Sequence, residues 1–240
     1  MSLYAIGDLH LSFQSDKSME VFGEEWKNHS DKIRENWCSI INESDTIVVT
    51  GDHSWGKKLE DSLEDLEFIA SLPGRKILLR GNHDRFWKKT NRTEELNELF
   101  NGKLLFLQNN YYAYIDEKSG KEYALIGSKG FSIDDYCFLA QDKIEKRLKN
   151  ESSRLIKSYE AAKDAGYENF IMFLHYPPTN MYEKEGVFTK LAQEFGVEQV
   201  IYSHLHGKER FDYSIEGQNN GVEYVLVSSD YLDFMPRLVK

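Results

Sequence analysis

Five short polar segments carry the side chains best suited to metal-dependent chemistry. Each contains histidine, aspartate or asparagine, and each comes where a short apolar run ends. The segments are Gly7-Asp8-Leu9-His10, Gly51-Asp52-His53, Gly81-Asn82-His83-Asp84, His175 and His204-Leu205-His206. They hold six of the seven histidines of the chain. One such segment alone would be ordinary, because polar residues are common in turns. Five of them at the ends of predicted strands indicate a shared site.

The donor atoms of these segments decide which metals would fit. Carboxylate oxygen, imidazole nitrogen and amide oxygen form a mixed nitrogen and oxygen set without thiolate. Such a set suits Mn²⁺, Fe or Zn²⁺ better than Ca²⁺ or a structural zinc finger. In the pairs Asp8/His10 and His204/His206, one residue separates the two side chains, so an extended backbone points both to the same side. We therefore expect a metal site built from distant parts of the chain.

Short apolar strands and amphipathic helices alternate in the first third of the chain. Strands are predicted at residues 3–6, 46–49 and 77–79, and helices over 31–42 and 58–71, where apolar residues recur near helical spacing. Repeated strand–helix units favour a parallel sheet covered by helices. Because the carboxyl ends of parallel strands face one crevice, the polar segments that follow them would converge there.

The middle of the chain has a different pattern. Three runs at residues 104–108, 111–115 and 122–127 are separated by short turns, which predicts consecutive antiparallel strands. A charged helix is predicted over about residues 140–165, with its Lys and Glu residues as a solvated face. The remaining predicted elements are strands at 170–174, 197–202 and 222–227 and a short helix at 187–195.

Composition and charge limit the possible functions. The 240 residues carry a formal net charge of −10, which argues against general binding of nucleic acids or membrane surfaces, because both need a basic face. We find no apolar run long enough for a transmembrane helix and no signal-like N-terminus. The two cysteines, Cys38 and Cys137, lack metal-type spacing and are expected to be mostly buried thiols in a reducing cytoplasm. We expect one domain over residues 1–240, of undetermined oligomeric state.

The chain resembles the calcineurin-like metallophosphoesterases in the order and spacing of all five polar segments, from Asp8-x-His10 to His204-x-His206. The resemblance covers about residues 3–229. In the wider context of GDHSWG and HYPPTN, the chain is also similar to a bacterial branch of predicted phosphohydrolases. The resemblance implies an α/β fold, a four-layer α/β/β/α sandwich. It also implies two divalent or trivalent metal ions, Mn, Fe or Zn, at the carboxyl edge of the sheets.

The resemblance further implies a role for each polar side chain. The implied metal ligands are Asp8, His10 and His206 for one ion, Asn82, His175 and His204 for the other, and Asp52 as a bridge. His83 would not bind metal but would lie beside the substrate as a general acid. Asp84 would orient His83.

Two positions depart from the family pattern. Ser203 stands where glycine is usual, and its small side chain is expected to change little. His53 stands where the family often has an apolar residue; it could contact substrate, bind metal, point to solvent or pack against the loop. Arg85, Lys129 and Trp55 are further candidates for substrate contacts, with solvated or packing roles as the alternative.

The predicted reaction is hydrolysis of a phosphomonoester, phosphodiester or pyrophosphate bond, with a bridging hydroxide as nucleophile and His83 as the acid. The sequence contains no Gly-x-Ser-x-Gly elbow and no nucleotide-binding phosphate loop. The expected partner is a small phosphorylated substrate. Two alternatives stay open: a scaffold or binding module without catalysis, and a nuclease. The complete set of ligand positions counts against the first, and the acidic charge counts against the second.

Overall fold

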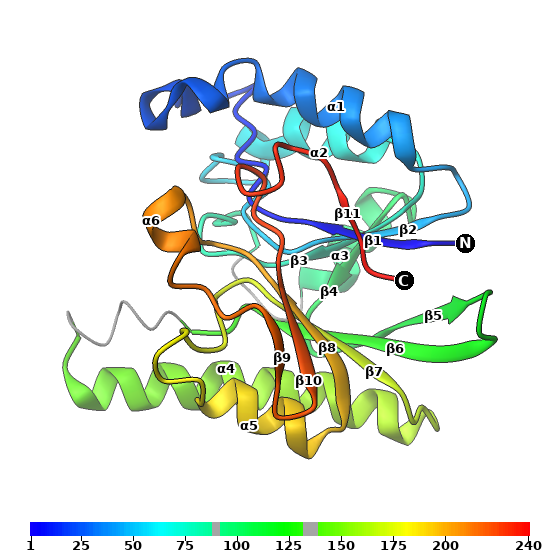
Figure 1. The fold of residues 1–240 in the computed structure, drawn as a ribbon. Coiled ribbons are helices and arrows are strands. Elements are labelled where there is room, and N and C mark those ends of the chain that lie inside the picture. Colours follow the sequence, from blue (N-terminus) through cyan, green and yellow to red (C-terminus); the bar gives the residue numbers. More distant parts are fainter. Residues whose placement is uncertain (88–91, 132–138) are drawn as a thin grey trace.

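Two β-sheets pack face to face, with helices on both outer sides (Figure 1). The computed structural model describes residues 1–87, 92–131 and 139–240. The strand order is β11-β1-β2-β3-β4 in the first sheet and β5-β6-β7-β8-β10-β9 in the second. This arrangement confirms the expected four-layer sandwich.

The first sheet is parallel except at one edge. Its parallel strands are β1 (Leu3–Ile6), β2 (Thr46–Val49), β3 (Arg75–Leu79) and β4 (Leu104–Leu107), and β11 (Arg237–Leu238) runs antiparallel to β1. Parallel strands need crossover connections. The crossovers contain α1 (His29–Ile40), α2 (Leu63–Ser71) and α3 (Arg92–Leu99) and the 3₁₀ helices η1 (Met19–Phe22), η2 (Glu24–Trp26) and η3 (Glu60–Ser62).

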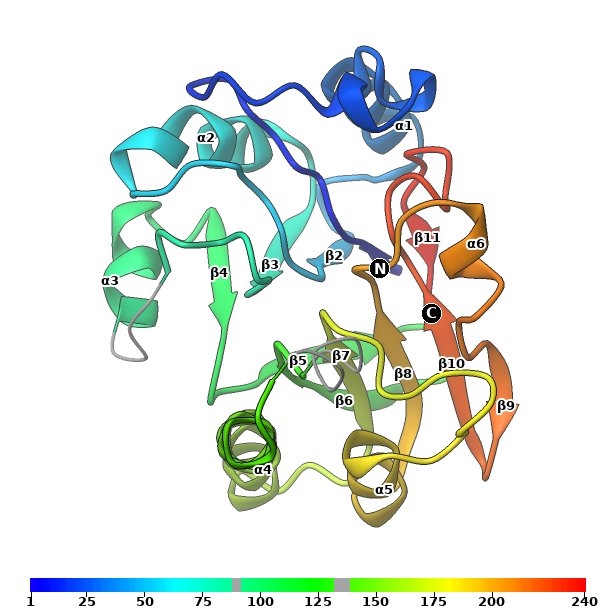
Figure 2. The same ribbon diagram turned by 90° about the vertical axis from the view of Figure 1, so that its left-hand side faces the viewer.

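The second sheet is mixed. Its strands are β5 (Tyr112–Asp116), β6 (Lys121–Ser128), β7 (Phe170–Leu174), β8 (Val197–Tyr202), β9 (Gly217–Asn219) and β10 (Val222–Leu226). The strands from β6 through β7 and β8 to β10 are parallel, and the two edge strands pair antiparallel. Its helices are α4 (Gln141–Asp164), α5 (Val187–Glu194) and α6 (Lys208–Phe211). The helices α4 and α5 cover its outer face (Figure 2).

Successive side chains of a strand point to opposite faces of its sheet, which explains how one strand contributes to two apolar layers. In β1, Leu3 and Ala5 belong to the apolar cluster between the two sheets, whereas Ile6 packs into the cluster with α1 and α2. Both faces of such a strand are therefore buried, which explains why the parallel strands read as unbroken apolar runs. A third cluster lies between the second sheet and the helices α4 and α5.

One prediction about the middle of the chain was wrong. The run at 104–108 does not pair with its neighbour in sequence: β4 lies parallel to β3 in the first sheet, and antiparallel pairing is confined to β5 and β6. The chain changes sheets at residues 108–111, where Asn110 accepts a hydrogen bond from the Gln108 amide and donates one to the Phe106 carbonyl. This side chain satisfies backbone groups in place of a strand partner.

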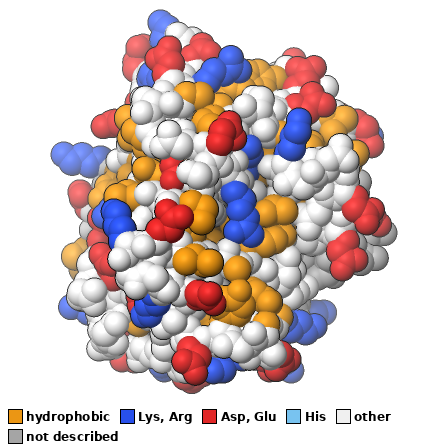
Figure 3. All heavy atoms as spheres, turned by 90° about the vertical axis from the view of Figure 1, so that its right-hand side faces the viewer, with side chains coloured by type: hydrophobic (Ala, Val, Ile, Leu, Met, Phe, Trp, Pro, Cys, Tyr) orange, Lys and Arg blue, Asp and Glu red, His pale blue; other side chains and the backbone are white. Residues whose placement is uncertain are grey.

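The expectation of buried cysteines also needs correction, because Cys38 is exposed on α1; Cys137 lies outside the described residues. Within the described part of the chain, no helix is both long and apolar enough to span a bilayer. Figure 3 shows the edge opposite the strand carboxyl ends, where charged side chains surround apolar ones. The predicted ligands follow the carboxyl ends of their strands and so lie at the other edge.

Candidate metal centre

All seven predicted ligands lie in loops at the carboxyl edge of the two sheets, the edge that faces the viewer in Figure 2. Four follow strands of the first sheet, and three follow strands of the second. They are Asp8 and His10 after β1, Asp52 after β2, Asn82 after β3, His175 after β7, and His204 and His206 after β8. The site is therefore shared between the sheets.

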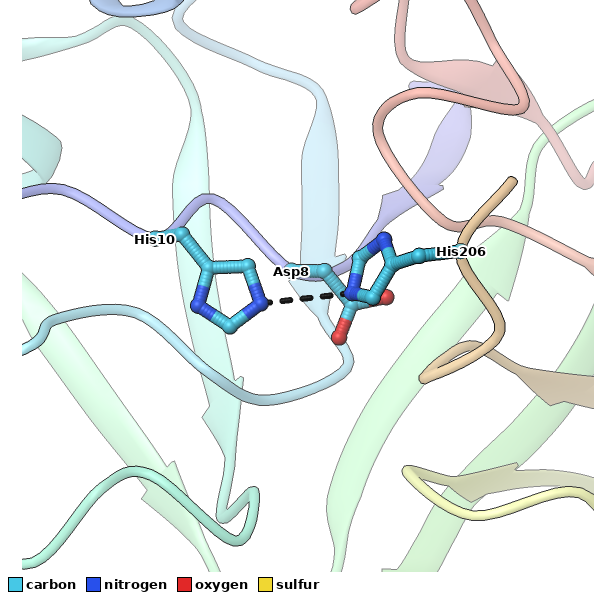
Figure 4. A group of neighbouring side chains, drawn as sticks. All are labelled: Asp8, His10 and His206. Carbon is cyan, nitrogen blue, oxygen red and sulfur yellow. Dashed lines mark hydrogen bonds between the residues drawn. The ribbon is translucent and has the colours of Figure 1, made fainter. Parts of the chain in front are cut away.

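The structure brings six of these side chains into two groups. One group is Asp8, His10 and His206, and the other is Asp52, His175 and His204; within each, one ligand atom per residue lies within 4.8 Å of the others. Figure 4 shows the first group, in which the ring of His10 faces the ring of His206 next to the carboxylate of Asp8. The first group has the members that motif position implied; the second contains Asp52, the implied bridge, beside His175 and His204.

The first group fits a cation because two imidazole nitrogens and a buried carboxylate oxygen lie close together in it. The Nδ1–H of His206 donates to Asp230 Oδ1 over 2.9 Å, which places the lone pair on Nε2. That nitrogen lies 3.3 Å from Nε2 of His10. Oδ1 of Asp8 is buried and has no hydrogen-bond partner among the described residues. A buried carboxylate oxygen without a donor, beside two imidazole nitrogens, is a typical setting for a metal ion.

The second group has the same property. The Nδ1–H of His175 donates to the Thr50 carbonyl over 3.0 Å, so Nε2 carries the lone pair. Nε2 faces two oxygen acceptors, Oδ1 of Asn82 at 2.7 Å and Oδ2 of Asp52 at 3.4 Å. With its proton on Nδ1, His175 donates to neither oxygen, and a cation between the three atoms would complement their electron pairs. Asn82 thus joins the group that contains His175.

Asp52 lies between the two groups. Its Oδ2 is 3.4 Å from Nε2 of His175 and 3.9 Å from Nε2 of His10. This oxygen is buried without a hydrogen-bond donor among the described residues, while Oδ1 accepts from the His83 amide over 2.7 Å. A backbone hydrogen bond thus fixes Oδ1 of Asp52, and Oδ2 remains available to contact both predicted metal ions.

The backbone at the site is strained. Four predicted ligands adopt positive φ angles: Asp8 at 58°, His10 at 46°, Asp52 at 54° and His204 at 77°. The left-handed region costs an ordinary residue about 1–2 kcal/mol, and such strain gathers at functional sites. The Asp8 carboxylate offsets part of this cost, because its Oδ2 accepts from the His204 amide over 2.8 Å.

Burial controls the protonation of the ligands. Burial raises the pKa of Asp8 to about 6, against the lowering effect of His206. Burial, together with the charges of Asp84 and Asp8, raises the pKa of Asp52 well above its usual range. Burial lowers the pKa of His10 and His175 well below the ordinary value, so both rings stay neutral, which is the form that binds metals. A bound cation would reverse the effect on the two carboxylates.

Asp84 does not have the position predicted for it. Its carboxylate accepts from the amides of Gly81, Asp52 and His53 at 2.7, 2.9 and 2.9 Å, and its Oδ2 lies 3.0 Å from Nδ1 of His53. It therefore orients the Asp52 loop and His53, because the backbone donors surround it, and no described hydrogen bond joins it to His83. His53 is fully buried, so the predictions of a substrate contact or a solvent-facing ring at this position were wrong.

The other candidate contacts have different surroundings. Trp55 stacks on His10, with ring centroids 4.8 Å apart, and lies 4.2 Å from the His83 ring. Arg85 is exposed and lines a cavity next to His83. The Lys129 ammonium lies 3.9 Å from Glu151 Oε1 and 4.6 Å from the centre of the Tyr176 ring. Whether any of the three contacts substrate stays a prediction.

Sequence reasoning missed two residues that shape the centre. Asp230 accepts from Nδ1 of His206 and also from the Gly207 amide at 3.1 Å. It closely follows β10, so the strand-end rule that selected the other segments could have found it. Trp26 packs edge-on against His10 and His206, with centroids 6.0 and 5.6 Å away. It lies in a 3₁₀ helix far from any strand end, and no local signal indicates it.

The family model for calcineurin-like phosphoesterases matches residues 1–208. The chain belongs to this family. A curated relative, the gene 66 protein of Mycobacterium phage L5, is 30% identical over 77 residues, which are 32% of this chain and 37% of that protein. The chain thus matches little more than a third of that relative's length.

Two solved structures have a similar fold. A phosphopantetheinyl hydrolase from Mycobacterium tuberculosis aligns with a TM-score of 0.61 and 14% identity, covering 99% of this chain and 95% of that one. A protein of unknown function from Aquifex aeolicus aligns with a TM-score of 0.54 and 18% identity over the same shares of the two chains. At such low identity, these similarities concern the fold alone.

Proposed function

We propose that the chain is a phosphohydrolase that uses two metal ions to cleave a phosphate ester or pyrophosphate bond. The observation that best supports this is the convergence of imidazole nitrogens and carboxylate oxygens from the two sheets. Nε2 of His206 faces His10, and Nε2 of His175 faces Asn82 and Asp52. Family membership supplies the reaction class.

The residues divide between the two ions as follows. Asp8, His10 and His206 would hold one ion, Asn82, His175 and His204 the other, and Asp52 would contact both. When bound, the ions would supply Lewis acids for the phosphoryl oxygens and a water of lowered pKa as nucleophile. The donor set favours Mn, Fe or Zn.

His83 is placed to act on the leaving group. Its side chain is 30% exposed, and Nε2 lies 4.0 Å from Oδ2 of Asp52. Burial lowers the pKa of His83 to about 4; Asp84 opposes this, while Lys17 and Arg85 add to it. The free ring is therefore neutral at pH 7 and must gain a proton before it can act as the acid. The negative charge of a bound phosphate raises the pKa and favours the protonated acid.

The test combines metal analysis with an assay. We expect the purified chain, supplied with Mn²⁺, to bind metal stoichiometrically and to hydrolyse a chromogenic phosphodiester or phosphomonoester. His206→Ala should lose metal and activity together. Failure of the wild-type chain to bind metal, or a turnover that does not depend on metal, would overturn the proposal.

A second variant tests the role of His83 as the general acid. His83→Ala should retain its metal and lose about 10²–10⁴ in rate, the usual contribution of a general acid. The loss should be smallest for substrates with good leaving groups, because these need no proton. Loss of metal in this variant would instead make His83 a ligand.

A further inference from the structure

Two cavities meet at the candidate centre, and Trp55 and His83 line both. The first, the metal-side cavity, has a volume of about 360 Å³ and is lined by predicted ligands that include His10, His204 and His206. The second, the loop cavity, has a volume of about 470 Å³ and is lined by residues 14–17, 55–57, Asp61, His83 and Arg85. Each is large enough for part of a small-molecule ligand, since such sites measure about 300–1,000 Å³.

Beside the predicted ligands and Asp230, the metal-side cavity is lined mainly by apolar side chains, with one further carboxylate, Glu25, and one cation, Arg210. Met19, Phe22 and Trp26, from η1 and η2, line it together with Trp55. Phe22 is 62% exposed, which leaves its ring available to a bound molecule. This cavity would hold the reacting phosphoryl group next to an apolar or ring-shaped substituent.

The loop cavity has the opposite character. Lys17, Lys57 and Arg85 line it with Asp16 and Asp61, so three cations face two carboxylates in a chain whose net charge is −10. The Lys17 ammonium lies 3.4 Å from the centre of the Trp55 ring, the wall that the cavities share. This local excess of positive charge next to His83 favours an anionic occupant.

We propose that the substrate has two arms and that the loop cavity binds the leaving group, which carries a negative charge of its own. This inference rests on the proposed function. In a phosphoryl transfer, the attacking and leaving oxygens lie roughly in line on opposite sides of phosphorus. The attacking water belongs with the metal ligands, and the leaving oxygen belongs beside His83, at the wall between the cavities. The leaving group therefore extends past His83 towards Lys17 and Arg85.

This assignment narrows the substrate class to a phosphodiester or pyrophosphate with unlike arms. Hydrolysis forms one bond from the water oxygen to phosphorus and breaks the bond from phosphorus to the leaving oxygen. The leaving oxygen keeps the electron pair of the broken bond and takes a proton from protonated His83. The attacking water releases one proton to solvent, and His83 regains its proton from solvent. The products are a phosphomonoester from the apolar arm and an anionic alcohol or phosphate from the other.

The experiment compares two phosphodiesters that differ in one charge. Both carry the same phenyl arm, and their leaving groups are 4-hydroxybenzenesulfonate and the uncharged 4-hydroxybenzenesulfonamide. With Mn²⁺, we expect the wild-type kcat/KM to be about tenfold higher for the sulfonate, the factor that corresponds to about 1.4 kcal/mol. The preference should shrink as salt is added, because exposed charges are screened.

The matched variants test the two cations. The double variant Lys17→Ala/Arg85→Ala should bring the ratio of the two kcat/KM values close to one, whatever its overall rate. Both side chains are exposed, so the fold should be retained. Lys58→Ala, an exposed neighbour that does not line the cavity, should keep the wild-type preference.

The outcomes separate this inference from the proposed function. Hydrolysis of both esters without a preference, or a preference that the double variant retains, overturns the assignment of the loop cavity and leaves the phosphohydrolase proposal standing. Metal-dependent turnover of neither ester, nor of simple chromogenic substrates, overturns the proposed function itself. A preference that the double variant abolishes supports the two-armed substrate.

Discussion

Asp84 shows how a side chain can have a role that its motif does not reveal. Its place after His83 suggested a partner for that ring, but the carboxylate turns back to three backbone amides and to His53. Burial opposes ionisation of Asp84, yet the charge of His53 and these hydrogen bonds lower its pKa. Asp84 therefore joins the loop after β2 to the loop after β3.

The variant Asp84→Asn tests this role. Its amide nitrogen would face a backbone donor or His53, so the variant should lose about 3–5 kcal/mol of stability, the usual cost of breaking a buried pair. Because the amide of Asp52 is one of the three donors, metal binding should weaken as well. Urea unfolding and metal analysis measure the two effects. A stable variant with full metal content but impaired proton donation would return Asp84 to the role of orienting His83.

Asp230 supports a second prediction at the level of a single residue. Asp230→Asn keeps the shape of the side chain but weakens the hydrogen bond that fixes the His206 ring. Partners of this kind typically contribute 10–100-fold to metal affinity, and we expect a loss of about that size in a Mn²⁺ titration. Asp233→Asn, at an exposed position with φ of 49°, is the control and should bind metal normally. Equal affinity in both variants would contradict the role of Asp230.

At the level of elements, the sequence predicted the helices and strands that a local pattern of residues specifies, but not every pairing between strands. Most of the parallel strands were indicated by apolar runs, the helices α1 and α2 by helical spacing and α4 by its run of charged residues, and the strand ends indicated the predicted ligands that follow them. The pairing of β4 was missed, because its partner β3 lies across a helix in the sequence and the choice depends on packing between the sheets. The loop cavity was missed for the same reason: nothing local brings residues 14–17 next to His83.

Close approach between the loops after β2 and β3 gives a prediction for Gly81. A Cβ there would overlap the carboxylate and the amide nitrogen of Asp52. Gly81→Ala should therefore cost about 1–3 kcal/mol of stability through overpacking and weaken Mn²⁺ binding. Gly120→Ala, in a turn with open space and φ of 70°, should cost about 1 kcal/mol through backbone strain alone and leave binding intact. Thermal unfolding and calorimetric titration distinguish the two, and an unchanged affinity in Gly81→Ala would count against the tight contact.

At the level of the whole molecule, Asp45 joins the start of β1 to the connection before β2. Its carboxylate accepts from the amide of Ser2 at 2.7 Å and from the amide and side chain of Asn42 at 2.9 and 3.3 Å. Burial would raise the pKa of Asp45, but these hydrogen bonds outweigh it and lower the pKa. A carboxyl with a lower pKa in the folded state stabilises the fold above its unfolded pKa, and this contribution is lost as pH falls through the folded pKa.

Asp45→Asn should therefore reduce the free energy of unfolding by about 1–3 kcal/mol at pH 7. The difference between variant and wild type should shrink as the pH falls below about 4, where the wild-type carboxyl also becomes neutral. Urea unfolding across this pH range measures both effects. Glu168→Gln, at an exposed loop position, is the control. A difference that stayed constant from pH 7 to pH 3 would show that charge is not the cause.

The placement of the predicted ligands on both sheets has a consequence for the proposed metalloprotein's lifetime. Asp8, Asp52 and Asn82 come from the first sheet, and His175 and His204 come from the second, so ions bound between them would hold the two halves of the sandwich together. Free metal at 100 times its dissociation constant adds about 2.7 kcal/mol of stability per site. Proteases in the cell act on the opened chain, so its lifetime would follow the metal supply. Under metal starvation, proteolysis would therefore lower the amount of this protein, in addition to any loss of activity per molecule.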